Sequence, residues 1–320
     1  MREIGGYIEL DSYCLPMMYE EGIKLNSGRN ALAYIIKAKK IKKILMPFLM
    51  CDSCNAILER LGVNIRYYEV GIDFMPVDIE RDEEEYLYIV NYYGQLSNNY
   101  LASLGSKTIV DNVQAYFQSP VKGIDTIYTC RKFFGVADGA ILFTDKILDE
   151  KLQTDESFER MHFLLGRYER SASEFYQEYV SNNKQFATAG IKKMSKLTLN
   201  LLHGIDYKSI KTIRTYNFTY LHERLKDRNI LHLNMIEGAF MYPFFHEMGY
   251  EIREELQKKK IYTPILWPNV LNTCNKNSMA FNMAGNIVAL PVDQRYGLDE
   301  MKYICDILDC IVEKKDENRV

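Results

Sequence analysis

The sequence has no long apolar run and no excess of charge of one sign. Its 320 residues include 40 Lys and Arg against 43 Asp and Glu, a formal net charge of −3. This balance gives no support to a nucleic-acid or anionic-membrane partner. No apolar stretch approaches the roughly 20 residues that cross a bilayer, and no apolar signal-peptide core follows the first four residues. We therefore expect a cytoplasmic protein with no nucleic-acid and no membrane partner.

The cysteines do not form a disulfide framework. There are seven, an odd number scattered along the chain, which is typical of reduced thiols in an intracellular protein. Cys51 and Cys54 have the Cys-x-x-Cys spacing of zinc and redox sites. A structural zinc needs four ligands, however, and the sequence has no second such pair. We predict no metal site, and reduced thiols are favoured over a redox pair.

No internal repeat or low-complexity linker interrupts the chain, and its length favours a large domain followed by a smaller one. In the first half, short apolar segments alternate with helical patterns, which predicts a mainly parallel sheet between helices. The expected strands are residues 43–47, 65–70, 86–90, 108–110 and 124–128, with 140–144 as a closing strand whose antiparallel direction is left open.

The second half is expected to be helical first and mixed later. We place the large domain at residues 1–205, including an N-terminal arm and a charged helical segment at 145–205. A small α+β domain follows at 206–320. Its predicted elements are strands at 239–243, 261–264 and 287–291 and a helix at 250–259.

A lysine and an acid stand out because each lies beside apolar residues. Lys132 precedes Phe133-Phe134-Gly135, a setting that predicts burial, and Asp111 follows an apolar strand, with Gln114 three residues later. A buried acid and a buried lysine are the pair that pyridoxal phosphate requires: the acid keeps the pyridine nitrogen protonated, and the lysine forms the Schiff base. The alternatives are a surface lysine and an acid that only caps a turn or helix.

These residues and their neighbours resemble the DegT/DnrJ/StrS sugar-nucleotide aminotransferases, which are fold type I pyridoxal-phosphate enzymes. Asp111 and Gln114 match the family's Glu-Asp-Ala-Ala-Gln-Ala motif, while Lys132 with Asp138 and Gly139 matches its lysine motif. Further matching segments occur in the same chain order at residues 26–32, 45–48, 90–95 and 290–296. The resemblance implies an α/β, fold type I transferase-like large domain with a smaller C-terminal α+β domain.

The resemblance also implies the catalytic roles and the cofactor, pyridoxal 5'-phosphate. Lys132 would form the Schiff base and then move the proton between substrate and cofactor. Asp111 would pair with the ring nitrogen, and Gln114 would contact the phenolic oxygen or a nearby polar group. Cys51 would lie over the ring. Thr129 would supply a hydroxyl.

The phosphate is expected where a helix begins at residues 28–30. Backbone N–H groups and the helix dipole favour an anion there. Gly28, Arg29 and Asn30 lie at the family's phosphate-binding position, and a guanidinium at Arg29 can hold a phosphate through two hydrogen bonds. Gly28 and Asn30 are alternatively no more than the start of a helix.

The implied reaction transfers the amino group of glutamate to a nucleotide-linked keto sugar within a homodimer, for a cell-surface glycan. Tyr93, Tyr128 and Arg295 are the candidate substrate contacts, although the tyrosines are expected more often in packing. Alternatives are another reaction on the same cofactor, such as amino-acid transamination, dehydration or lyase chemistry, and a non-catalytic protein of the same fold. An Arg295 that points at the cofactor would favour an amino-acid substrate, and one that faces solvent or an acid would favour the sugar.

Overall fold

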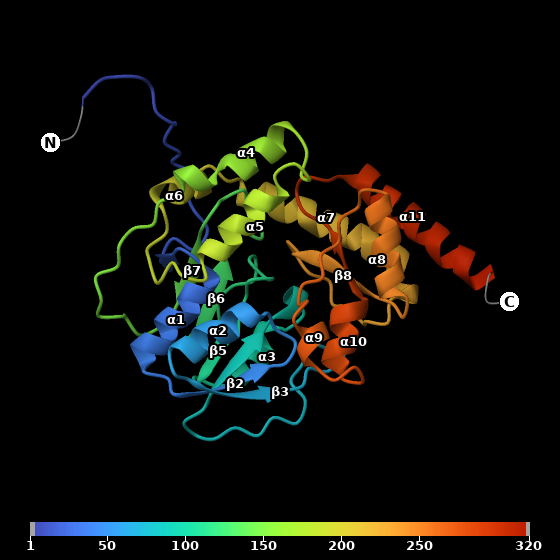
Figure 1. Ribbon diagram of the computed structural model, residues 1–320, viewed down its shortest axis with the longest axis horizontal. Coiled ribbons are helices and arrows are strands. Elements are labelled where there is room, and N and C mark those ends of the chain that lie inside the picture. The colour runs from blue at the N-terminus through green and yellow to red at the C-terminus, as the bar shows by residue number, and fades with distance from the viewer. Residues whose placement is uncertain (1–3, 318–320) are drawn as a thin grey trace.

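The computed structural model describes residues 4–317, and a seven-stranded sheet forms its centre (Figure 1). The strands lie in the order β1-β7-β6-β5-β4-β2-β3. Their bounds are β1 Ile23–Leu25, β2 Lys43–Pro47, β3 Asn64–Tyr68, β4 Tyr86–Val90, β5 Thr108–Asp111, β6 Asp125–Thr129 and β7 Ala140–Phe143.

The sheet is mainly parallel, as the alternating pattern predicts. Strands β2 to β6 all run in one direction, whereas β7 is antiparallel to both β6 and β1. All residues of β5 and β6 are buried, because central strands of a parallel sheet are covered by helices on both faces. The expected closing strand is thus confirmed as antiparallel, and β1 is an addition to the predicted set.

Helices and short 3-10 turns connect and cover these strands. α1 packs against β6 and β7, and α2 packs against β3. The elements of this first part are α1 Gly28–Lys39, α2 Asp52–Arg60, η1 Tyr92–Gly94, α3 Asn98–Ser103, η2 Phe158–Arg160, α4 His162–Glu169, α5 Tyr176–Gln185 and α6 Lys196–Leu202. The last four are the helical part of the segment from 145 to 205, while residues 145–157 and 186–195 are irregular.

A second hydrophobic core lies in the C-terminal part, where β8 and β9 form an antiparallel pair. Helices α7, α8 and α11 pack around this pair. The bounds are α7 Tyr207–Leu225, η3 Lys226–Arg228, β8 Met241–Phe245, α8 Gly249–Lys258, α9 Val270–Thr273, α10 Met279–Asn286, β9 Ile287–Pro291 and α11 Leu298–Glu317. Two cores agree with a two-domain organisation, while the boundary at 205/206 stays a prediction.

The strand predicted at residues 261–264 is wrong. This segment is irregular, because Lys260 adopts a left-handed conformation at φ 60° and the Ile261 N–H closes the end of α8 on Leu256 O. Pro264 has no N–H to offer to a ladder. The other small-domain predictions hold within two residues.

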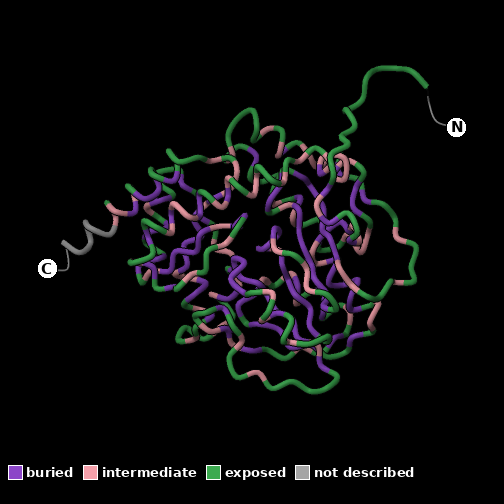
Figure 2. The backbone as a smooth tube through the Cα atoms, turned by 180° about the vertical axis from the view of Figure 1, so that it is seen from behind, coloured by how far each residue is buried: buried purple, intermediate pink, exposed green. Residues whose placement is uncertain are grey.

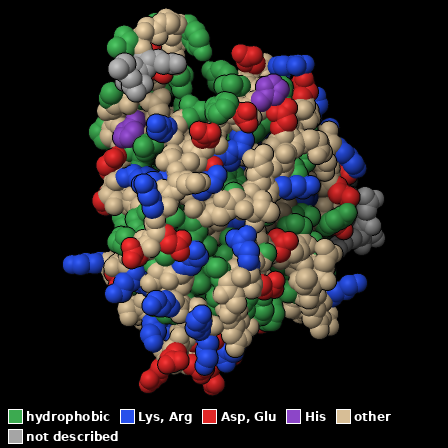
Figure 3. All heavy atoms as spheres, turned by 60° about the vertical axis from the view of Figure 1, so that its left-hand side comes forward, with side chains coloured by type: hydrophobic (Ala, Val, Ile, Leu, Met, Phe, Trp, Pro, Cys, Tyr) green, Lys and Arg blue, Asp and Glu red, His purple; other side chains and the backbone are tan. Residues whose placement is uncertain are grey.

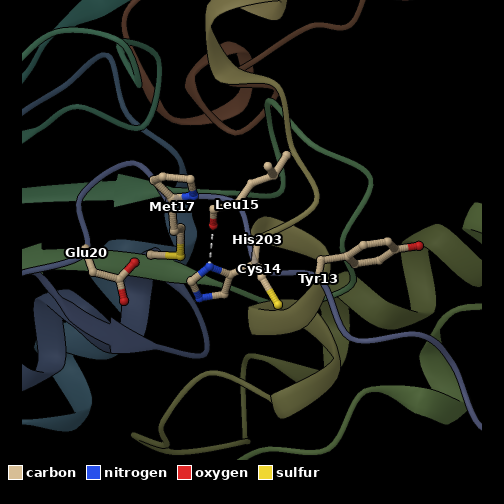
Figure 4. A pocket seen from close by; sticks show the side chains of 7 residues that line it. Tyr13, Cys14, Leu15, Met17, Glu20 and His203 are labelled. Carbon is tan, nitrogen blue, oxygen red and sulfur yellow. Dashed lines mark hydrogen bonds between the residues drawn. The ribbon is translucent and has the colours of Figure 1, made fainter.

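The N-terminal arm crosses the end of α6 before it enters the sheet (Figure 4). Leu15 N–H donates to His203 O at 3.0 Å, and His203 Nδ1 lies 2.8 Å from Leu15 O. The shallow pocket beside this contact is lined by Tyr13, Cys14, Leu15, Pro16, Met17, Glu20 and His203, none of which is a predicted site residue. Farther toward the N-terminus the arm is exposed (Figure 2).

The surface agrees with the balanced composition. On the face drawn in Figure 3, basic and acidic side chains are interspersed and no broad patch of one sign is seen. Among the helices of residues 4–317, none is long and apolar enough to cross a membrane. Within the same residues, no three or more His, Cys, Asp or Glu side chains are grouped in a way that could hold a metal ion.

The start of α8 at Gly249 lies very close to the backbone at the end of α10, which gives a testable prediction about packing. A Cβ at Gly249 would lie 2.1 Å from Asn286 O, whereas a Cβ at Gly285 would meet only Leu271 at 3.6 Å. Gly249→Ala should therefore destabilise the protein by about 1–3 kcal/mol. Gly285→Ala, inside α10, should be neutral or stabilising by up to about 1 kcal/mol. Urea unfolding checks both; equal effects would contradict this packing.

Candidate functional site

The candidate residues gather at the carboxyl ends of the parallel strands, where ligands of α/β sheets bind. Asp111 ends β5, Lys132 lies in the turn after β6, and Cys51 follows β2 at the start of α2. The positive charge of Lys132 acts on both Asp111 and Cys51: it opposes the burial that raises the pKa of Asp111, and it contributes to the lowered pKa of Cys51. The structure thus brings together three residues that are far apart in the sequence.

Asp111 is a buried carboxyl group with two donors. Its Oδ2 accepts a hydrogen bond from Tyr88 Oη at 2.7 Å, and its Oδ1 accepts one from Val113 N at 3.0 Å. Burial raises its pKa, against the opposing effects of Lys132, Tyr88 and the Val113 amide. An acid in this setting gains from a cationic partner, because a cation offsets the cost of the buried charge. Tyr88 was not predicted as a site residue, although the strand that carries it, β4, lies beside β5.

Lys132 is exposed, so the prediction of a buried lysine is wrong. The turn after β6 carries Phe133 and Phe134 into the core and leaves the lysine directed outward, with its Nζ 5.3 Å from the centre of the Phe240 ring. Phe240 immediately precedes β8. The lysine therefore lies between the carboxyl edge of the sheet and the C-terminal part of the chain.

A buried arginine fixes the turn that carries Lys132. Arg214 of α7 donates to Phe133 O at 3.3 Å and lies 4.7 Å from the Phe133 ring centre. Gln294 Nε2 also donates to Phe133 O at 2.8 Å, and Gln294 Oε1 accepts from Arg214 Nε at 2.8 Å. Arg214 makes two more bonds, to Ala239 O at 2.9 Å and Phe240 O at 3.3 Å. The lysine turn is thus tied to both α7 and the approach to β8.

Arg131, next to Lys132, is a cation that sequence reasoning missed. Its Nε is buried and has no hydrogen-bond partner among the described residues, while its Nη2 donates to Asn183. Burial lowers its pKa to about 10, and the like charges of Arg29 and Arg160 contribute. We refer to Arg29, Arg131 and Arg160 as the arginine group; Arg160 already pairs with Asp155 at 2.9 Å, and guanidinium groups bind anions such as phosphate through charge-assisted hydrogen bonds. The sequence signal of Arg131 was its adjacency to Lys132.

The predicted phosphate residues at the start of α1 divide into two kinds. Arg29 belongs to the arginine group just described. Asn30 is instead buried, with its Nδ2 bonded to Asn26 Oδ1 at 3.0 Å and to Gly190 O, so its side chain is occupied within the protein. Ser27 caps the helix by accepting from Asn30 N at 3.3 Å. A Cβ at Gly28 would meet Val113 at an ordinary 3.6 Å, so the structure does not require glycine there.

Gln114 and Thr129 are buried beside these residues. Gln114 Oε1 accepts from Tyr93 N at 2.9 Å and so holds Tyr93 at its left-handed φ of 52°. This leaves the Gln114 amide nitrogen as the group for a ligand. Thr129 ends β6 and donates to Gly139 O at 3.4 Å, which occupies the hydroxyl hydrogen that was expected to reach the cofactor.

Cys51 lies at the start of α2 with its sulfur 3.1 Å from Ser53 Oγ. A hydrogen bond from Cys54 lowers the pKa of Cys51 to about 6, with further contributions from Ser53 and Lys132 that outweigh burial. Its position near Lys132 and Asp111 agrees with the expectation that it borders the site.

The three candidate substrate contacts are not gathered at the site. Tyr128 is 0% exposed, stacks on Tyr19 and donates to Gln118 O at 2.7 Å, so as a substrate contact it is corrected to a packing residue. Tyr93 is likewise buried, near Arg253 and against Trp267. Arg295 pairs with Asp293 through two bonds of 2.6 and 2.8 Å, so it faces a structural acid.

No family model and no curated protein matches the sequence, but solved structures do. A DegT/DnrJ/EryC1/StrS aminotransferase from Brucella abortus is 14% identical with a TM-score of 0.62, covering 90% of this chain and 85% of its own. NtdA from Bacillus subtilis, solved with its bound cofactor PMP, is 12% identical with a TM-score of 0.62 over 91% and 73%. DesI, solved with its TDP-sugar product, is 10% identical with a TM-score of 0.61 over 93% and 83%.

At these identities the comparisons establish the architecture. The mainly parallel sheet between helices and the smaller C-terminal part match these structures over about nine-tenths of the chain. The expected resemblance is confirmed in the fold: the chain has the fold type I architecture of the DegT/DnrJ/EryC1/StrS aminotransferases.

Proposed function

We propose that this protein is a pyridoxal-phosphate-dependent aminotransferase that moves the amino group of glutamate to a nucleotide-linked keto sugar. The observation that carries the proposal is the placement of Asp111 and Lys132 at the carboxyl edge of the sheet, where the lysine charge opposes the burial that raises the pKa of the acid. The fold shared with a DegT/DnrJ/EryC1/StrS aminotransferase and with DesI, which was solved with its TDP-sugar product, supports it.

The residues present fit the cofactor. When bound, pyridoxal phosphate supplies an electron sink for the substrate carbon through its protonated ring. Asp111 would hold the ring nitrogen's proton, because a buried carboxylate with only neutral donors gains most from a cationic partner. The exposed amine of Lys132 would hold the cofactor covalently and, once released, move a proton at the substrate carbon. Cys51 would border the ring.

The arginine group fits the phosphate. Arg131 carries a buried Nε without a partner among the described residues, and Arg29 stands at the start of α1, where backbone N–H groups attract anions. A dianionic phosphate would relieve the mutual repulsion of the guanidinium groups. Gly28 would contribute its backbone N–H, whereas Asn30 is already bonded through its side chain to Asn26 and Gly190 and through its N–H to Ser27.

The sugar is favoured over an amino-acid acceptor by Arg295. Fold type I enzymes that act on amino acids use an arginine to hold the substrate carboxylate through two bonds. Here both guanidinium bonds of Arg295 go to Asp293, and Asp293 in turn has its pKa lowered by Arg295 despite burial. The second candidate function, an amino-acid transaminase, lacks this contact.

The proposal includes a homodimer in the cytoplasm. Sites of fold type I enzymes are completed at a subunit interface, as the resemblance implies. All seven cysteines are free, in keeping with a reducing compartment. Sedimentation should give twice the 37.4 kDa chain mass, and a monomer that transaminates would contradict this part.

Asp111→Asn tests the role of the acid. Burial raises the pKa of Asp111 in the folded protein. The stability that the protonated carboxyl contributes is therefore lost as pH rises through the raised pKa. The asparagine amide does not ionise, so the variant does not lose stability in this way. The asparagine can still accept from Val113 N. We expect the thermal midpoint at pH 7 to fall by no more than about 3 °C and turnover to fall at least about 100-fold. Turnover within a few-fold of the parent would show that Asp111 is only a turn residue.

Arg131→Met tests the phosphate site. Loss of one charge-assisted contact, about 1.5–3 kcal/mol, should weaken pyridoxal-phosphate binding by about 10- to 100-fold. Binding of pyridoxal, which has no phosphate, should change little. Arg167→Met, at an exposed arginine of α4, is the matched control. Equal losses for both ligands would exclude a phosphate contact.

Half-reactions followed by absorbance test the proposed function itself. Glutamate should convert the loaded protein to its amino form, and a nucleotide-linked keto sugar should reverse the change. Arg295→Met should leave the KM for glutamate within about two-fold, because its guanidinium is committed to Asp293. Rapid reversal by simple 2-oxo acids alone, with no response to any keto sugar, would refute the sugar assignment.

A further inference from the structure

Cys51 and Cys54 share one tight turn at the start of α2. Cys51 is the residue before the helix, and its side chain makes no capping hydrogen bond. The Cys54 N–H reaches Cys51 O at 3.5 Å, which closes the turn. Residues three positions apart at a helix start lie about 5 Å apart, within the Cα range that a disulfide spans.

The two thiols are chemically unlike. Cys51 is partly exposed, and the hydrogen bond from Cys54, the Ser53 hydroxyl and the Lys132 charge lower its pKa to about 6. Cys54 is buried, and its hydrogen bond to Cys51 together with burial raises its pKa well above the ordinary value. In a redox pair, the attacking member is a thiolate that solvent can reach, and the resolving member is a buried thiol next to it.

The other cysteines lack this arrangement. Burial raises the pKa of both Cys130 and Cys305. Cys14 and Cys310 are exposed, but no other two cysteines of the sequence lie within four positions of each other. The pair is therefore distinguished by spacing, by the turn and by its neighbours.

We propose that Cys51 and Cys54 are a redox-active pair that forms a reversible intramolecular disulfide by exchange with a low-molecular-weight disulfide such as glutathione disulfide. The Cys51 thiolate attacks one sulfur, forms a mixed disulfide and releases one thiolate. Cys54 then loses its proton, attacks the Cys51 sulfur and releases the second thiolate. The protein loses two electrons and two protons, and one small disulfide becomes two thiols.

Oxidation would change the candidate site directly. The disulfide removes the negative charge of Cys51 from the neighbourhood of Lys132 and Asp111 and draws its sulfur toward Cys54. This consequence rests on the proposed function, whereas disulfide formation does not. The chemistry of the pair can therefore be tested without cofactor.

The experiment uses the full-length protein without cofactor, with Cys14, Cys274 and Cys310 replaced by serine. Glutathione disulfide should remove two thiols, and peptide mapping should find Cys51 joined to Cys54 without retained glutathione. In the same background Cys54→Ser should hold one glutathione on Cys51, and Cys51→Ser should not react. The rate should rise with a midpoint near pH 6, from the Cys51 pKa of about 6.

Two results would overturn the pair. One is a stable glutathione adduct on Cys51 while Cys54 is present, because the resolving step would then be absent. The other is first reaction at Cys54 or at a different cysteine. Pyridoxal-phosphate titration of the reduced protein separates the two proposals: absence of binding counts against the proposed function alone, while the peptide map decides the pair.

Discussion

A single buried guanidinium, that of Arg214, joins the two halves of the candidate site. It is 1% exposed and bonds carbonyl oxygens of the lysine turn and of the segment before β8. Burial lowers the pKa of Arg214 to about 10, with the Asp293 charge opposing this effect, so the cation persists at neutral pH. A buried cation that lost these acceptors would be destabilised by several kcal/mol. The position of Lys132 relative to Phe240 depends on this constraint.

The charged groups at the carboxyl edge of the sheet are likewise governed by the cost of burying a charge, which a nearby opposite charge offsets. Among the described residues, the donors to the buried Asp111 carboxyl are neutral, and the charge of the exposed Lys132 acts on both Asp111 and Cys51. Arg131, next to Lys132 in the chain, forms no salt bridge among the described residues, and the like charges of Arg29 and Arg160 act on it. A cation would stabilise the buried acid, and an anion would stabilise the arginine group. These are the protonated ring and the phosphate at the two ends of pyridoxal phosphate. This match is the basis on which we propose that the site holds a ligand with a protonated ring and a phosphate.

The sequence predicts the sheet and much of the site for a local reason. Apolar runs such as β4 are recognisable as strands from the sequence alone. The last residue of a parallel strand lies at the carboxyl edge of the sheet, where ligands bind, and Asp111 ends β5 as expected. Where neighbours in space decide the outcome, local pattern fails. Lys132 was expected to be buried because Phe133 and Phe134 are, yet the turn sends them in another direction. Tyr88 is placed by its hydrogen bond to Asp111, and Arg131 by its burial and the charges of other arginines, which no local pattern records.

The central claim is that Lys132 is the residue that carries the cofactor. The most direct measurement is borohydride reduction of the protein loaded with pyridoxal phosphate, followed by peptide mapping. The account predicts the pyridoxyl mass on Lys132 and its loss in Lys132→Arg, with Lys192→Arg, whose amine pairs with Asp155 at 3.2 Å, as the matched control that keeps the label. A pyridoxyl group on another lysine, or labelling that persists in Lys132→Arg, would contradict it.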